Sequence, residues 1–95
     1  MYADREQLPS ALAAAAHWER RMTADAADFE AAWKLARVCY WLGSHVPEAD
    51  RRRRFEQGIA AGARAAALRP DRPDGHFWMA ASMGAMAEGF GLRAG

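Results

Sequence analysis

The chain has 95 residues, of which 52% are hydrophobic, and a formal net charge of +1 at pH 7. This length predicts one domain, residues 1–95. Much of the apolar content is alanine, so the core should be small and marginal without oligomerisation. The near-neutral charge excludes a general attraction to nucleic acid or to a membrane surface. A single cysteine excludes an internal disulfide framework.

The residues that follow Met1 are polar and charged, which is not the pattern of a secretory signal peptide. No apolar run reaches the roughly 18 residues that a membrane-spanning helix requires. We therefore expect the protein to remain in the cytoplasm without membrane insertion. A chain cut from a longer precursor would instead be periplasmic.

The first predicted helix, residues 10–23, is half of a helical hairpin. Ala14 and Trp18 lie one turn apart and place a small and an aromatic residue on one side. The segment before this helix, residues 1–8, is too short and too polar to supply a partner helix. Residues 23–28 should form the turn to the next helix.

The central predicted unit, residues 28–69, contains two antiparallel helices joined by an enlarged turn at residues 44–55. Asp28 is a good N-cap for the first of these helices, because its carboxylate can accept from free backbone N–H groups. Gly43 is a natural residue to end it, since glycine adopts positive φ without steric cost. This helix is apolar on most sides, so other elements should cover most of it.

Small residues form the inner face of the second helix in this unit. Gly58 and Gly62 each cost about 1 kcal/mol relative to alanine in a helix interior. We therefore expect another helix to approach closely at these two positions. They also form a GxxxG pattern, but the arginines beside them exclude a membrane helix.

The last predicted helix, residues 74–89, follows a proline-rich turn and should begin with Asp74 as its N-cap. It reads as another half of a hairpin, because no further helix follows to cover it. Residues 89–95 should be frayed, since three of them are glycine. A flexible apolar row runs along the helix at helical spacing: Met79, Met83, Met86 and Phe90.

This all-α pattern of about four antiparallel helices resembles the tetratricopeptide repeat, a unit of 34 residues that forms an α–α superhelix. The matching positions in this sequence are Leu35, Ala36, Tyr40, Gly43, Gly58, Ala65, Leu68 and Pro70. Ala32 and His76, which look equivalent, are 44 positions apart, ten more than the standard period. The excess falls in residues 44–55.

The same stretch is similar to the T-component of bacterial TRAP transporters, a repeat protein associated with periplasmic solute uptake. The similarity covers residues 14–84 and is carried by the runs 32–43, 56–59 and 68–78. It implies a role as a small-ligand or solute-associated accessory component. This is the alternative to a protein-binding role.

We expect the protein not to be an enzyme, and no cofactor or metal is predicted. His17, His45 and His76 are widely separated, and no HExxH, HxxxH or CxxC motif occurs. Cys39 should be a small buried apolar residue. The run Arg51–Arg54 should be a solvated, partly ion-paired surface, since four consecutive helical residues point around the whole cylinder.

In repeats of this kind, ligands lie along the inner face of the first helices. The residues that match this face are Glu30, Trp33, Arg37, Tyr40, Trp41 and Phe77. Aromatic residues and arginine often anchor interfaces. Trp41 either contributes to such an interface or is buried beneath the enlarged turn. An enclosed apolar cavity around these aromatics would favour a small ligand, whereas an open groove would favour a protein.

We therefore predict a protein–protein interaction scaffold whose partners include an unidentified protein and a second copy of the chain. Self-association would use the methionine row, because the last helix has no following helix to cover it. Two incomplete arrays could complete each other in a two-fold dimer.

Overall fold

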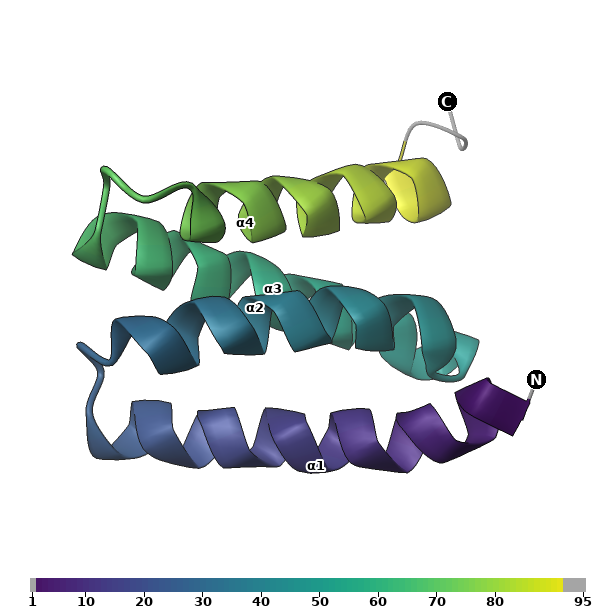
Figure 1. Ribbon diagram of the computed structural model, residues 1–95. Helices are drawn as coiled ribbons and strands as arrows, with labels where there is room; N and C mark the ends of the chain where they lie inside the picture. The colour runs from purple at the N-terminus through teal and green to yellow at the C-terminus, as the bar shows by residue number, and fades with distance from the viewer. Residues whose placement is uncertain (1, 92–95) are drawn as a thin grey trace.

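In the computed structural model, the protein is a stack of helices in which each helix runs antiparallel to the one before it (Figure 1). The structure describes the backbone of residues 2–91 and the side chains of residues 7–89. The helices are α1 (Tyr2–Ala24), α2 (Phe29–His45), α3 (Glu48–Leu68) and α4 (Pro73–Met86), and a π-helix, Ala87–Gly91, continues α4. The described backbone contains no strand, which confirms the all-α prediction.

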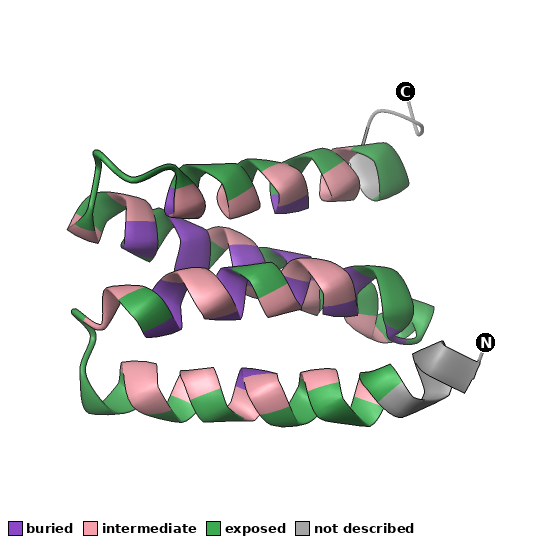
Figure 2. Ribbon diagram, in the orientation of Figure 1, coloured by how far each residue is buried: buried purple, intermediate pink, exposed green. Residues whose placement is uncertain are grey.

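The α2 helix is the centre of the molecule. Figure 1 shows α1, α2 and α4 side by side, with α3 behind α2 and α4. Figure 2 shows that buried positions concentrate on α2 and α3, whereas α1 is mostly exposed or half-buried. A helix contacted from three directions needs apolar residues around most of its circumference. The buried positions of α2 are Ala31, Ala32, Leu35, Ala36, Cys39, Leu42 and Gly43.

The enlarged turn predicted at residues 44–55 is not present. Instead, α2 continues to His45 and α3 begins at Glu48, so the extra residues lengthen both helices. Pro47 sets this boundary, because a proline disfavours helical backbone in the residue before it. Val46 accordingly has an extended ψ of 164°. Trp41 therefore cannot be buried beneath an insert, as one of the two readings of this residue required.

Three predicted helix boundaries also differ from the structure. The α1 helix begins at Tyr2 rather than near residue 10, and it passes through Pro9. Gly43 lies within α2, where a side chain would collide with the ring of Phe55. The α4 helix begins at Pro73, because proline suits the first helical position, where its missing N–H needs no partner. Asp28 does cap α2, and its side chain accepts from the Ala31 N–H at 3.1 Å.

The glycines of α3 lie where other helices approach, as predicted. A Cβ on Gly62 would lie 2.8 Å from Cβ and 2.9 Å from the backbone nitrogen of Met79 in α4. A Cβ on Gly58 would lie 2.7 Å from Oγ of Ser82 in α4 and 3.2 Å from Cβ of Cys39 in α2. These distances are too short for a side chain. The small residues therefore allow α3 to pack against α2 and α4 together.

Candidate protein-binding surface

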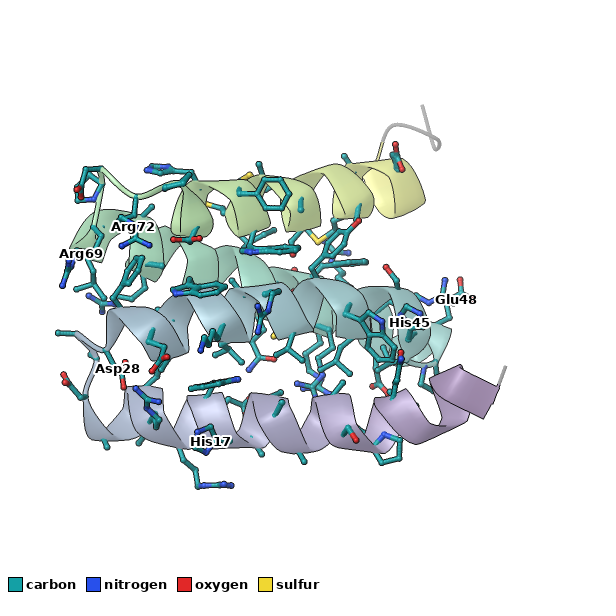
Figure 3. All side chains as sticks on the ribbon, in the orientation of Figure 1. His17, Asp28, His45, Glu48, Arg69 and Arg72 are labelled. Carbon is teal, nitrogen blue, oxygen red and sulfur yellow. The ribbon has the colours of Figure 1, made fainter. Side chains whose placement is uncertain are left out.

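The six residues predicted for the binding face lie on α2 and α4. Glu30 and Arg37 are exposed, whereas Trp33, Tyr40 and Trp41 are half-buried. Phe77 of α4 is 60% exposed, which is unusual for a large aromatic side chain. The side chains that face the viewer in Figure 3 extend across α2 and α4.

Aromatic rings connect α2 to α4 through Trp78, a residue that was not included in the predicted face. The ring centroids of Tyr40 and Trp78 are 5.8 Å apart, and those of Trp78 and Phe77 are 4.7 Å apart. Both distances lie in the range of favourable aromatic pairs. Trp78 thus contacts both the exposed Phe77 ring and the Tyr40 ring of α2. The sequence signal for it was its position beside Phe77 in a helix, but its contact with Tyr40 requires the tertiary fold.

Cationic side chains cover several of the aromatic rings near the start of α2. The guanidinium carbon of Arg37 lies 5.0 Å from the Trp33 ring centroid. Lys34 Nζ lies 5.6 Å from the Trp33 ring and 5.2 Å from the Trp18 ring. These are cation–π distances. We call the full set the cation–aromatic surface, and it comprises Trp18, Arg21, Phe29, Trp33, Lys34, Arg37, Arg69 and Arg72.

Several cations of this surface are already paired with carboxylates. Arg21 Nη2 lies 2.9 Å from Asp28 and 3.0 Å from Glu30, and Lys34 Nζ lies 2.8 Å from Glu30. The Ala31 N–H and Arg21 hold the pKa of Asp28 below its usual value. Lys34 and Arg21 likewise lower the pKa of Glu30. These pairs keep both carboxylates charged and fix α1 against the start of α2.

A pocket of about 390 Å³ lies at the opposite end of the helices, between α2, α3 and the end of α4. Its lining is mixed and comprises Tyr40, Gly43, Ser44, Glu48, Arg51, Phe55, Ala85, Glu88 and Gly89. Trp33 and Trp41 do not line it, and Trp41 instead stacks on His45 with ring centroids 3.7 Å apart. Tyr40 alone of the predicted aromatics lines this mixed pocket, so Trp33, Tyr40 and Trp41 do not together enclose an apolar ligand cavity.

A partly buried polar network joins α1, α2 and α3. Gln57 donates to Glu19 of α1 and accepts from Cys39 Sγ at 3.3 Å and from Arg54 Nη1 at 2.9 Å. Burial raises the pKa of the Cys39 thiol to about 12, so the thiol stays protonated and is a poor nucleophile. Arg54 is therefore not part of a solvated surface, in contrast to the prediction for the arginine run. Its side chain is only 12% exposed.

The methionine row is only partly available to a second chain. Met79 is half-buried and lies against Gly62 of α3, and Met86 is also half-buried. Met83 is 48% exposed. Phe90, the last member of the row, lies outside the side chains that the structure describes.

The described part of the chain contains neither a cluster of metal-ligating residues nor a membrane-spanning helix. No group of three or more His, Cys, Asp or Glu residues there could hold a metal ion. None of the described helices is long and apolar enough to cross a membrane. What the described residues do offer is a surface of exposed aromatic and cationic side chains on an all-α fold.

This combination defines an all-α helical protein with an exposed aromatic and cationic surface. A protein-family model described as regulator of microtubule dynamics protein 1-3 matches residues 4–94, and the chain belongs to this family. No curated protein and no solved structure matches it. The family supports a non-catalytic, interaction-type protein.

The family match also corrects the resemblance drawn from the sequence. The matching family is neither the tetratricopeptide repeat nor the T-component of TRAP transporters, so this assignment was wrong. Nothing in the comparisons supports the solute-transport role that the resemblance implied. The residues that suggested it have other roles here: Gly58 admits two neighbouring helices, and Gly43 accommodates the Phe55 ring.

Proposed function

We propose that the chain is a non-catalytic scaffold that binds another protein across α2 and α4. The observation that carries this proposal is the exposed ring of Phe77, which is supported by Trp78 and Tyr40. A rigid aromatic held on the surface is a typical anchor of a protein interface. Phe77 of α4 is linked through Trp78 to Tyr40 of α2, so the proposed surface includes both helices.

The description of the family indicates the first partner to test. Because its members are described as regulators of microtubule dynamics, we propose microtubules or their subunits as the partner. A partner of this kind would place the chain in the cytoplasm. A second copy of the chain remains part of the proposal, through Met83 and Met86.

Co-sedimentation with polymerised microtubules tests this proposal. The wild-type chain should pellet with the polymer, and Phe77→Ala should weaken binding by about fivefold or more, as loss of an interface anchor does. Leu12→Ala is the matched control, because Leu12 is also an exposed apolar residue, 38% accessible, but lies on α1. Wild-type protein that stays in the supernatant, or equal losses in both variants, would contradict the proposal.

A further inference from the structure

We propose that the cation–aromatic surface binds an extended acidic polypeptide segment, whose carboxylates pair with Arg37 and Arg69. This inference rests on the proposed protein-binding function and specifies the chemistry of the partner. The structure contains two arginines on this surface, Arg37 and Arg69, that lie over aromatic rings and form no ion pair among the described residues.

Arg37 is exposed on α2 and is held in place by the Trp33 ring, 5.0 Å from its guanidinium carbon. The described side chains provide no carboxylate within ion-pair distance of it. A guanidinium that lies over a ring can still donate from its N–H edge. This edge matches a carboxylate in a bidentate geometry, so Arg37 is preorganised for one.

Arg69, which follows α3, likewise lies over an aromatic ring, that of Phe29 at the start of α2. The turn between α3 and α4 brings Arg69 and Arg72 to the Phe29 ring, each 5.7 Å from its centroid. In Figure 3, both arginines lie at the end of the molecule where Asp28 begins α2. Arg72 pairs with Asp74 at 3.3 Å, but Arg69 has no carboxylate partner among the described side chains. Arg69 is exposed and therefore open to a partner.

The spacing of the two sites suits an extended chain. Phe29 and Arg37 are eight residues apart on α2, which corresponds to roughly 12 Å along the helix axis. An extended polypeptide rises about 3.3 Å per residue, so four residues cover roughly 13 Å. Side chains four residues apart in such a chain point in the same direction. A segment with acidic residues at positions i and i+4 can therefore reach both arginines.

The surface favours a polypeptide over a nucleic acid. Asp28, Glu30 and Asp74 lie among the cations, and all three are engaged in ion pairs. A continuous row of phosphates would meet these carboxylates, whereas side-chain carboxylates four residues apart can avoid them. The half-buried Trp33 between the two arginine sites offers an apolar contact to the intervening residues.

Fluorescence anisotropy with a labelled peptide of alternating glutamate and glycine tests this proposal. The wild-type chain should bind this peptide, bind a serine–glycine peptide at least about tenfold more weakly, and lose affinity as salt is added. Arg37→Gln and Arg69→Gln should each lower affinity by about tenfold, because each removes one charge-assisted pair. Arg64→Gln is the control, since Arg64 is also exposed but lies on α3. Circular dichroism should show equal helicity in all variants.

Three results would overturn the inference. They are equal binding of the acidic and neutral peptides, an Arg64→Gln loss as large as that of Arg37→Gln, and tighter binding of an oligothymidylate than of the acidic peptide. Failure here is separable from failure of the proposed function. A chain that pellets with microtubules through Phe77 but ignores the acidic peptide would retain the function and lose only this inference.

Discussion

At the scale of single residues, the hydroxyl of Ser82 is the clearest local defect of the core. Ser82 is fully buried, and its Oγ has no hydrogen-bond partner among the described residues. It lies in α4 at the point where α3 approaches through Gly58. A buried polar atom without a partner loses its hydration and gains nothing in return.

We therefore predict that Ser82→Ala stabilises the protein by about 1 kcal/mol, the order of cost of an unsatisfied buried hydroxyl. Urea denaturation followed by circular dichroism measures the free energy of unfolding. Ser44→Ala is the control, because Ser44 is exposed and should give almost no change. A destabilised Ser82→Ala variant would show that the hydroxyl makes a hydrogen bond, for example to an ordered water.

A second residue-scale prediction concerns the Cys39 thiol, whose pKa burial raises from 9.0 to about 12. The folded protein keeps the thiol protonated, whereas the unfolded chain releases its proton as the pH rises above about 9. In this range the unfolded state binds fewer protons than the folded state. The contribution of the thiol to stability is therefore complete below pH 9 and is lost between pH 9 and 12. Cys39→Ala should remove this part of the pH dependence.

Urea denaturation between pH 7 and pH 10.5 checks this prediction, with the difference between wild type and Cys39→Ala as the readout. Other titrating groups cancel in that difference. The native thiol should also react slowly with a disulfide reagent and react faster in urea. A difference that is independent of pH, or rapid labelling of the native protein, would contradict the burial of Cys39.

At the scale of the helices, glycine positions decide how closely α3 and α4 pack. Gly62 meets the backbone of α4, where a Cβ would lie 2.9 Å from the Met79 nitrogen and 3.0 Å from the Gly75 oxygen. Gly84 is also helical, but nothing lies within 4 Å of the position of its Cβ. The two glycines therefore have the same intrinsic helix propensity, but Gly62 lies against another helix and Gly84 lies in open space.

We predict that Gly62→Ala destabilises the protein by about 1–3 kcal/mol through overpacking, because backbone atoms cannot move aside easily. Gly84→Ala should stabilise it by up to about 1 kcal/mol, the propensity gain of alanine in an exposed helix. Thermal and urea unfolding of both variants provide the comparison. Stabilisation by both substitutions would mean that α3 and α4 are farther apart than the structure shows.

At the scale of the whole molecule, the exposed methionine of α4 is where we predict that two chains associate. The α3 helix covers Met79, but Met83 remains 48% exposed. Methionine adapts its shape to an imperfect apolar partner, so a dimer through this face would tolerate irregular packing. The exposed area is smaller than the sequence suggested, because Met79 and Met86 are half-buried.

We predict a dimer at micromolar concentration by sedimentation velocity, and Met83→Asp should shift it to the monomer with helicity kept. A charge placed at an apolar interface has to be desolvated without a partner, which disfavours association. Ala63→Asp, at an exposed position of α3, is the control and should leave the dimer intact. A wild-type monomer would refute self-association and leave the proposed α2–α4 binding surface unaffected.

Local sequence alone determined the helical architecture of this protein. Periodic apolar residues specify helices through the chain, and Asp28, Pro47 and Pro73 mark where helices begin. The cost of Gly58 and Gly62 in a helix interior correctly indicated a close helix contact. These features are readable because each depends on neighbours within one or two turns.

The tertiary structure alone decided how distant residues combine. Phe29 meets Arg69, which is 40 positions away, and Tyr40 meets Trp78 only because α4 lies beside α2. The family resemblance failed for a related physical reason. Small residues at helix contacts and prolines at helix ends satisfy the packing needs of any antiparallel helix pair, so they specify the architecture without specifying the family.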